Sequence, residues 1–324
     1  MSAPEPLACY AGVRTVVLGA SGFVGRWVAR RLARAGADLH LLIRDRQAAL
    51  AIFERYEIEG ALHQIDARAL GRLGSTLGDL APAIVFNLVG YGVDPEERSR
   101  PDERDATLLN AALPATLAEA LDPVSTGWTG RRVVHAGSVF EYGRIGGDLA
   151  EHSPPRPEGL YGITKLAGTQ GLAAACRRCG IPGLTARLCQ LYGPGEPPGR
   201  LLPMLIAART SGQLETMSQG TQRKDFTYVE DVAEGLLRLG ATSGPPGEIV
   251  NLATGRLLSV RDFVLTAARL LPLPIDLLRF DNPAPDNELV HEPISIARLR
   301  ELTEWSPGTT IDEGIRRTIA FGPD

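Results

Sequence analysis

The chain has 324 residues, and its 34 Lys and Arg residues against 38 Asp and Glu residues give a formal net charge of −4. This balance excludes a strongly basic nucleic-acid-binding protein, and 44% hydrophobic with 22% charged residues excludes a disordered chain. No apolar stretch of about 18 residues could cross a membrane, and the chain has only four cysteines, so we expect a cytoplasmic protein without a membrane partner.

Short apolar strands alternate with amphipathic helices over the first 190 residues. This alternation predicts an α/β fold, a Rossmann-type doubly wound parallel sheet with helices on both faces. The predicted strands are 14–18, 39–43, 62–65, 84–89, 132–136 and 184–188, and the predicted helices are 22–35, 105–121 and 161–178.

Three glycines separate the first strand from the first helix, in the sequence Gly19-Ala-Ser-Gly22-Phe-Val-Gly25. Gly19 permits a sharp turn, Gly22 lets the backbone approach a phosphate, and Gly25 lets the helix pack closely on the sheet. Free N–H groups at the positive end of a helix bind pyrophosphate. The turn therefore predicts a dinucleotide cofactor site.

The pattern changes after residue 190, where loops rich in Gly and Pro precede a helix predicted at 201–210. We therefore predict a dinucleotide-binding domain over 1–190 and a smaller C-terminal substrate-binding lobe, mainly 191–324. A helix is also predicted at 229–239, within a stretch, 225–240, that we expect to return to the first domain.

Only two of the 34 basic residues are lysines, Lys165 and Lys224. Lys165 lies one helical turn after Tyr161, so the phenol and the ammonium share one face of a predicted helix. A neighbouring cation favours the phenolate and lowers the pKa of a tyrosine from its usual value near 10. The pair therefore predicts proton exchange with a substrate alcohol or carbonyl, coupled to hydride transfer at nicotinamide.

The G-x-x-G-x-x-G turn, the Tyr161-x-x-x-Lys165 pair and motifs at 187–195, 224–231 and 305–307 resemble the extended short-chain dehydrogenases/reductases, in particular the nucleotide-sugar epimerase/dehydratase/reductase group. The resemblance implies that Ser138 binds the reacting oxygen and completes a catalytic set with Tyr161 and Lys165. It also implies a nucleoside diphosphate sugar as substrate, and a homodimer formed by the helices that contain Asn110 and Tyr161.

The same resemblance assigns residues to the two ligands. At the cofactor it implies Gly19, Ser21, Gly22, Phe23, Val24, Gly25, Arg44, Asp66, Leu88, Tyr161 and Lys165, with Asp66 at the adenine amino group. At the substrate it implies Gln190, Leu202 and Lys224. Gln190 replaces the asparagine usual in the group, and Lys224 replaces the usual arginine.

The end of the second predicted strand indicates which dinucleotide is bound. In the group that the chain resembles, NAD-preferring members carry an acidic residue there, whereas this chain has Ile43 followed by Arg44. An isoleucine cannot accept hydrogen bonds from ribose hydroxyls, but a guanidinium can pair with a 2′-phosphate. We therefore favour NADP, as NADPH, with NAD as the alternative.

The two residues after Ser138 bear on the reaction. In the 4,6-dehydratases of the group these positions hold an Asp-Glu pair, whereas this chain has Val139 and Phe140, which cannot transfer protons. The leading hypothesis is the NADPH-dependent reduction of a nucleotide-linked 4-keto hexose, such as a 4-keto-6-deoxy hexose. The alternatives are a C4 epimerase with tightly bound NAD and a cofactor-sensing binding protein without catalysis.

Three residues that could bind a metal are assigned to packing instead. Cys176 and Cys179 lie at the end of a predicted helix, where the helix dipole disfavours a thiolate. His135 lies in a predicted buried strand. No metal site is predicted.

Overall fold

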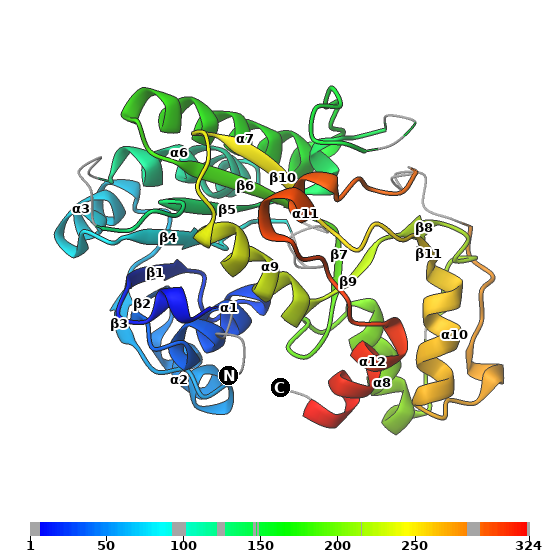
Figure 1. Ribbon diagram of the computed structural model, residues 1–324. Coiled ribbons are helices and arrows are strands. Elements are labelled where there is room, and N and C mark those ends of the chain that lie inside the picture. Colours follow the sequence, from blue (N-terminus) through cyan, green and yellow to red (C-terminus); the bar gives the residue numbers. More distant parts are fainter. Residues whose placement is uncertain are drawn as a thin grey trace.

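Seven parallel strands form the central sheet of the computed structural model, which describes residues 7–92, 102–121, 127–144, 147, 149–214, 216–283 and 292–322 (Figure 1). The strand order is β10-β6-β5-β4-β1-β2-β3, and each adjacent pair is parallel. The predicted Rossmann-type sheet is therefore confirmed. The strands are β1 (Arg14–Leu18), β2 (Asp38–Ile43), β3 (Ala61–Gln64), β4 (Ile84–Asn87), β5 (Val133–Ser138), β6 (Gly183–Leu188) and β10 (Glu248–Leu252).

Helices cover both faces of this sheet, with α6 and α7 on one side and α1 and α9 on the other (Figure 1). Side chains of β1 alternate between the two cores: Val17 packs on the α1 side, and Val16 and Leu18 pack on the α7 side. Burial on both faces explains the continuous apolar runs from which the strands were predicted. The helices are α1 (Phe23–Arg34), α2 (Arg46–Arg55), α3 (Leu70–Leu80), α6 (Leu113–Glu119), α7 (Gly159–Cys179), α9 (Val229–Ala241) and α11 (Ala297–Thr303).

One strand of the sheet comes from the C-terminal part of the chain. Strand β10 pairs with β6, from Glu248 opposite Leu184 to Leu252 opposite Leu188. Helix α9, in the stretch that we expected to return to the first domain, shares an apolar core with α1. The sequence analysis did not predict β10, because this five-residue segment includes Glu248 and Asn251 and carries no sign of the sheet that it joins.

The helix predicted at 105–121 is divided into α5 (Glu103–Ala106), a π-helical segment η2 (Thr107–Ala112) and α6. Asn110 lies in the π-helical segment and is fully buried. Its Oδ1 accepts a hydrogen bond from Tyr91 N at 2.9 Å, and its Nδ2 donates to Thr164 Oγ1 at 3.0 Å. Asn110 therefore joins the loop after β4 to α7, and such irregular turns are frequent at functional sites.

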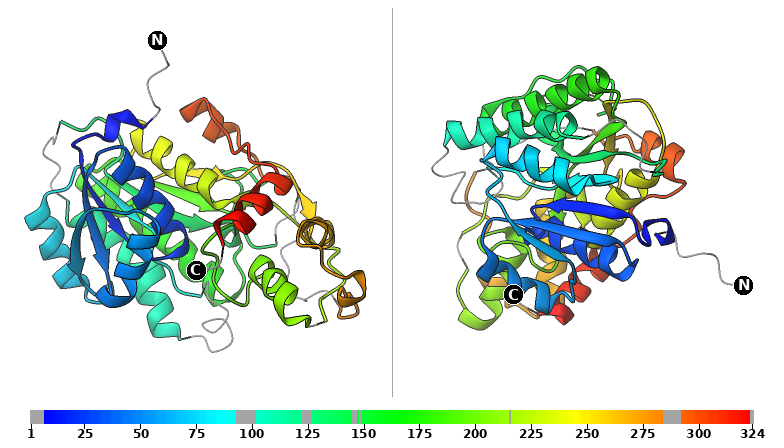
Figure 2. Two further views of the ribbon diagram at one scale, coloured as in Figure 1. Left: turned by 90° about the horizontal axis from the view of Figure 1, so that it is seen from below. Right: turned by 90° about the vertical axis from the view of Figure 1, so that its left-hand side faces the viewer.

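The smaller lobe packs around its own apolar core, in which the rings of Phe226 and Phe263 stack with centroids 4.3 Å apart. Figure 2 (left) shows α8 and α10 of this lobe at the opposite end of the molecule from β1–β3. Its elements are β7 (Gln190–Tyr192) paired with β9 (Phe226–Tyr228), β8 (Arg223–Lys224) paired with β11 (Leu258–Ser259), α8 (Leu201–Ser211), α10 (Val260–Leu270), η4 (Ile275–Leu277) and α12 (Ile311–Phe321). The remaining short helices are η1 (Ala8–Tyr10) and η3 (Val139–Glu141).

Asp225, between β8 and β9, ties the smaller lobe to the loop after β10. Its Oδ1 accepts hydrogen bonds from Thr227 Oγ1 at 3.1 Å and from Thr254 N at 3.0 Å, and its Oδ2 accepts from Gly255 N at 2.8 Å. A buried carboxylate with this many donors holds the backbone on both sides of it. The orientation of β8 and β9 beside the sheet follows from this contact.

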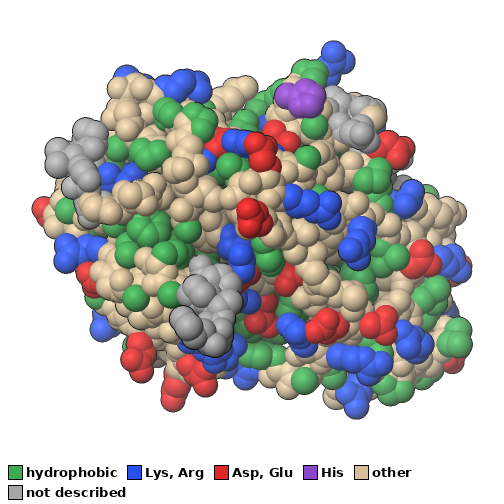
Figure 3. Space-filling view, in the orientation of Figure 1, with side chains coloured by type: hydrophobic (Ala, Val, Ile, Leu, Met, Phe, Trp, Pro, Cys, Tyr) green, Lys and Arg blue, Asp and Glu red, His purple; other side chains and the backbone are tan. Residues whose placement is uncertain are grey.

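Acidic and basic side chains are interspersed on the face of the molecule in Figure 3. This face carries both signs of charge side by side, in keeping with the small net charge of the chain. None of the helices in the described part of the chain combines the length and apolar character that crossing a membrane requires.

Candidate active site

The glycine turn between β1 and α1 has the shape of a phosphate cradle. Gly19 has a φ of +76°, in the left-handed region that favours glycine. A Cβ on Gly25 would lie 1.9 Å from Gly19 O, so α1 can pack this closely only with glycine at that position. Gly22 is the N-cap of α1 and has no side chain to cover the first N–H groups of the helix. The turn therefore fits the pyrophosphate of a dinucleotide.

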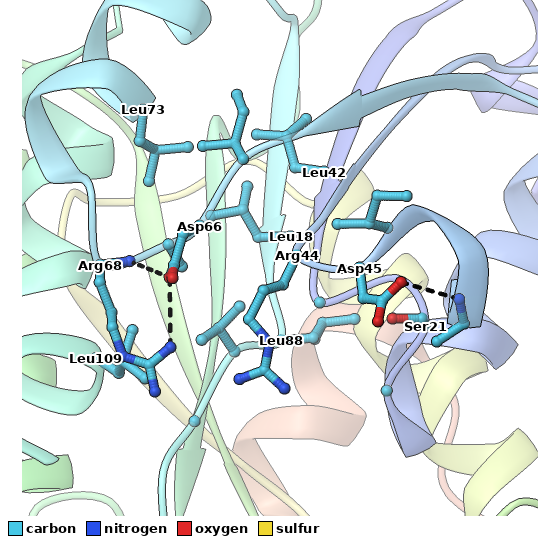
Figure 4. Close-up of a pocket in the computed structure, with 18 residues that line it drawn as sticks. Leu18, Ser21, Leu42, Arg44, Asp45, Asp66, Arg68, Leu73, Leu88 and Leu109 are labelled. Carbon is cyan, nitrogen blue, oxygen red and sulfur yellow. Dashed lines mark hydrogen bonds and ion pairs between the residues drawn. The ribbon is translucent and has the colours of Figure 1, made fainter. Parts of the chain in front are cut away.

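Beside this turn a cavity of about 400 Å³, here cavity A, opens at the carboxyl ends of β1, β2 and β3 (Figure 4). Much of its wall is apolar, with Leu18, Leu42 and Leu73 among the lining residues. Six predicted cofactor residues line it: Gly19, Ser21, Gly22, Arg44, Asp66 and Leu88. Its polar side chains, Ser21, Arg44, Asp45, Asp66 and Arg68, come from the segments that follow β1, β2 and β3.

Two arginines, Arg44 and Arg68, line cavity A. Arg68 donates from Nε and Nη2 to Asp105 at 2.8 and 2.5 Å, and its backbone N donates to Asp66 Oδ1 at 2.9 Å. The hydrogen bond from Arg68 lowers the pKa of Asp105, so this pair is an ionised salt bridge. Ile43 ends β2 as a buried residue, and Arg44 follows it, exposed, with its side chain among the lining residues in Figure 4.

A second cavity of about 340 Å³, cavity B, adjoins cavity A, and Gly22, Leu88 and Gly90 line both. The cavity is lined at the end of β5 by Ser138 and from α7 by Tyr161 and Lys165. The three predicted catalytic side chains thus come together around one space. Phe23 and Val24, two further predicted cofactor residues, line it as well.

Lys165 is 3% exposed, and its Nζ donates to Ala136 O at 2.9 Å. Burial lowers the pKa of this ammonium group to about 8, although the nearby Glu141 carboxylate opposes the shift. A Cβ on Gly90 would lie 3.1 Å from Nζ, so the glycine leaves room for the ammonium between the loop after β4 and α7. Lys165 is therefore a cation at neutral pH that is close to its titration point.

The two lysines of the chain allow this pKa to be measured directly. In protein labelled with [13C]lysine, the ε-methylene signal of Lys165 is expected to titrate with a midpoint of about 8. Lys224→Arg removes the other signal and assigns the first. Since the folded-state pKa lies below the unfolded value near 10.4, the free energy of unfolding should rise as pH increases from about 8 towards that value. A Lys165 midpoint near 10.4 would contradict the assignment of a desolvated ammonium.

Phe140 contacts both Ser138 and Tyr161. Ser138 Oγ accepts a hydrogen bond from Phe140 N at 3.2 Å, and the Tyr161 ring meets the Phe140 ring edge-on with centroids 5.9 Å apart. Phe140 itself lines cavity B. An apolar ring therefore occupies the position at which the sequence comparison expected a proton-transferring acid in dehydratases.

His135 packs beneath the site and does not line the cavities A and B. Asn87 Oδ1 accepts from Val89 N at 3.3 Å, which leaves Asn87 Nδ2 to donate to His135 Nδ1 at 3.1 Å. Complete burial, followed by the charge of Lys165, lowers the pKa of His135 well below its usual value. A neutral, enclosed imidazole has no access to a substrate.

A third cavity of about 300 Å³, cavity C, lies in the smaller lobe between α8, α10 and β8. Two predicted substrate residues, Gln190 and Lys224, line it, together with Gln222. Gln190 lines cavity B as well, so it stands where the two cavities meet. The apolar lining residues are Leu201, Met204, Met217, Phe226, Val260, Val264 and Phe280.

Leu202, the other predicted substrate residue, does not line cavity C. It is fully buried in the apolar core of the smaller lobe, whereas its neighbour Leu201 lines the cavity. The difference is one residue in α8, where a shift of one position rotates a side chain by about 100°. The sequence predicted this helix correctly but not the face that it turns to the cavity.

Several lining residues of cavity B were not predicted from the sequence, among them Cys189 and Arg200. Arg200 follows the Gly- and Pro-rich loop, and its Nε lies 3.5 Å from Glu196 Oε1. Burial raises the pKa of Glu196 to about 7. In a chain whose basic residues are nearly all arginine, composition could not single out Arg200.

Cys176 and Cys179 lie at the end of α7, and Cys176 is buried in the core on that side of the sheet. Burial raises the pKa of the Cys176 thiol to about 11. Over the described ranges, no three or more His, Cys, Asp and Glu side chains gather closely enough to hold a metal ion.

Cavities A and B lie at the carboxyl ends of the parallel strands, where α/β proteins bind their ligands. Together with the phosphate cradle and the residues of cavity B, this arrangement has the features of a nicotinamide-dinucleotide-dependent enzyme. The family follows from comparison with known proteins. Residues 15–253 match the NAD dependent epimerase/dehydratase family, and the chain belongs to this family.

Relatives of known activity and structure match almost the whole chain. A dTDP-6-deoxy-L-talose 4-dehydrogenase (NAD(P)(+)) of Kitasatospora kifunensis is 29% identical over 98% of this chain and 96% of its own length. A UDP-glucose 4-epimerase of Mycolicibacterium smegmatis is 26% identical over 95% and 98%. The structure of a UDP-glucuronic acid 4-epimerase from Bacillus cereus, with UDP-glucuronic acid and NAD, covers 95% of this chain and 98% of its own at 20% identity and a TM-score of 0.81.

Proposed function

We propose that this chain uses NADPH to reduce the keto group of a nucleotide-linked 4-keto hexose, such as a 4-keto-6-deoxy hexose. One observation carries the proposal: Ser138, Tyr161 and Lys165 line cavity B, and no carboxylate of the described residues lines it. Ketone reduction needs one proton donor and a hydride. Dehydration needs an acid and a base at neighbouring carbons, and Phe140 supplies neither.

Each catalytic side chain has its own task in this reduction. The Tyr161 phenol donates its proton to the carbonyl oxygen as that oxygen gains negative charge. Because Phe140 N donates to Ser138 Oγ, the serine proton remains available to hydrogen-bond the same oxygen. The Lys165 ammonium stabilises the phenolate that is left. The nicotinamide, when bound, supplies the hydride.

Cavity C supports a nucleoside diphosphate sugar as the substrate. Its apolar and aromatic lining suits a base, and Lys224 offers a cation to a diphosphate. Gln190 lines both cavity C and cavity B, so a sugar joined to that diphosphate would extend towards Tyr161. The Kitasatospora kifunensis relative is named for a reaction at sugar carbon 4, which agrees with the proposal. We propose Gln190, Lys224 and Leu201 as substrate contacts.

NADPH is proposed as the reductant because Arg44 exposes its guanidinium in cavity A. Arg44→Ala is expected to raise the KM for NADPH by about 10–100-fold, the worth of one charge-assisted contact, and to leave the KM for NADH within about 2-fold. Steady-state kinetics with both dinucleotides measure this. Arg46→Ala is the matched control, because Arg46 is exposed in α2 and does not line cavity A. Equal changes for both dinucleotides would contradict the role of Arg44.

The reaction itself is tested with purified protein and a panel of dTDP-, GDP-, CDP- and UDP-linked keto sugars. The expected result is consumption of one NADPH for each sugar reduced. The second candidate, a C4 epimerase with tightly bound NAD, is favoured by the likeness to the Mycolicibacterium smegmatis epimerase. If NAD copurified with the protein and turnover needed no added dinucleotide, the reductase proposal would be contradicted and the epimerase would be supported.

A homodimer is also proposed, through α7, which contains Tyr161, and through η2 and α6, which form the predicted helix that contains Asn110. These helices pack against each other on one face of the sheet (Figure 1). Ile163 of α7 is 52% exposed. A second copy of the same surface would bury this side chain. Light scattering of the purified protein is expected to give the mass of a dimer, and the mass of a monomer would contradict it. The cytoplasmic location stays a prediction.

A further inference from the structure

A buried ion pair lies directly behind Ser138. The side chains of Glu141 and Arg187 are 0% and 2% exposed, and Arg187 Nε donates to Glu141 Oε2 at 2.9 Å. Neither side chain lines cavity A, B or C. The pair therefore acts on the site from within the protein and not by touching a ligand.

The other carboxylate oxygen of Glu141 supports the backbone of Ser138. Glu141 Oε1 accepts a hydrogen bond from Ser138 N at 2.8 Å, while Ser138 Oγ accepts from Phe140 N. These two contacts form a reciprocal cap where β5 ends and η3 begins. Because the cap fixes the backbone of Ser138, it also fixes the direction in which the serine side chain points into cavity B.

Arg187 connects the pair to the neighbouring strands. It lies on β6 opposite Gly137 of β5, and its guanidinium stacks over the Tyr142 ring at 4.3 Å. Tyr142 OH donates to Asn251 Oδ1 on β10 at 2.7 Å. A Cβ on Gly137 would lie 2.6 Å from Glu141 Oε1, so glycine is required beside the carboxylate. Arg187, which holds Glu141, is thus linked through Tyr142 to β10.

A buried ion pair adds little net stability, because the desolvation of two charges offsets their attraction. Two apolar side chains of similar size would fill the same space, but they would leave the Ser138 N–H without its acceptor. We propose that Glu141, held by Arg187, is a positioning residue that sets Ser138 for catalysis. This inference rests on the proposed function, in which Ser138 binds the substrate carbonyl.

Two double variants separate this role from stability. Glu141→Gln/Arg187→Met and Glu141→Leu/Arg187→Met both remove the two charges together, and only the first keeps an oxygen acceptor for Ser138 N. The glutamine variant is expected to keep kcat within about 3-fold of the wild type, and the leucine variant to lose about 10–100-fold with little change in KM. Thermal unfolding of both checks that their stabilities match. Equal kcat values would overturn the inference.

Adding Ser138→Ala to each variant tests whether Glu141 acts through the serine. In the leucine background the extra loss of kcat is expected to be below about 3-fold, because the serine is already misplaced, and in the glutamine background it should equal the loss in the wild type. Losses that multiply in the leucine background would show that the two residues act independently, against the inference.

Amide hydrogen exchange provides a readout that needs no activity. Exchange of the Ser138 N–H, followed by NMR, is expected to be at least about 10-fold faster in the leucine variant than in the glutamine variant. If the wild-type protein reduced no sugar of the panel, the proposed function would be wrong, but hydrogen exchange would still test whether Glu141 supports the Ser138 backbone. Equal exchange rates in the two variants would overturn the inference. Glu141→Asp, which keeps the charge but shortens the side chain, replaces the leucine variant if that protein does not fold.

Discussion

Replacing Tyr161 with phenylalanine is expected to lower kcat by about 10²–10⁴-fold, the usual contribution of a positioned proton donor. The ring remains, so its edge-on contact with Phe140 and the wall of cavity B are kept. The hydroxyl is lost, and with it the transferable proton. NADPH-dependent reduction of the keto sugar measures kcat, and fluorescence titration of NADPH is expected to give a Kd within about 3-fold of the wild-type value.

Tyr10→Phe is the matched control for this prediction. Tyr10 is fully buried beside α9, where its hydroxyl donates to Leu237 O at 2.7 Å, and it lines neither cavity A nor cavity B. Its loss should reduce the free energy of unfolding by about 1 kcal/mol and leave kcat unchanged. If Tyr161→Phe turned over at the wild-type rate, Tyr161 would not be the proton donor and the proposed mechanism would be wrong. A wild-type protein that binds NADPH and turns over no substrate would favour the cofactor-sensing alternative.

Gly25→Ala is expected to weaken NADPH binding by about 10–100-fold, the loss of one or two charge-assisted contacts to the pyrophosphate. The added Cβ would lie 1.9 Å from Gly19 O and 2.8 Å from Gly19 C. Both atoms are backbone, so the start of α1 must move away from the turn that carries Gly22. The same overpacking should lower the free energy of unfolding by about 1–3 kcal/mol.

Gly78→Ala tests whether this effect belongs to the cradle. Gly78 lies in α3, and a Cβ there meets nothing within 4 Å. Because alanine is the better helix former, this control should raise stability by about 0.5–1 kcal/mol and leave NADPH binding unchanged. Chemical denaturation and fluorescence titration measure the two quantities. Wild-type NADPH affinity in Gly25→Ala would contradict the assignment of the turn as the pyrophosphate site.

The strands and the glycine turn could be predicted because their signals are local. Both faces of β1 and β5 are buried, so almost every side chain in them is apolar or small. Gly19 and Gly25 are required by a positive φ and by a close helix contact, and these constraints recur wherever such a turn meets a helix. The Tyr161–Lys165 spacing is likewise local, since one helical turn determines the shared face.

Other features of the site depend on neighbours that are far away in the sequence. Leu201 and Leu202 are alike in residue type, and the packing of α8 against the lobe core decides which one meets cavity C. Glu141 lies three residues after Ser138, yet its carboxylate does not line the cavities and pairs with Arg187, 46 residues further along. A pattern of residue types cannot distinguish a carboxylate that faces a substrate from one that faces the core.

The amino-acid order alone established the parallel sheet, the pyrophosphate turn and the pairing of a phenol with an ammonium, because each depends on the geometry of a single strand, turn or helix. Only the folded chain decided that β10 joins the sheet beside β6, that Gln190 lines both cavity B and cavity C, and that Arg187 holds Glu141 behind Ser138. These are contacts between segments separated by tens of residues. Their partners are selected by packing and by the need to satisfy buried polar groups, which periodicity does not encode.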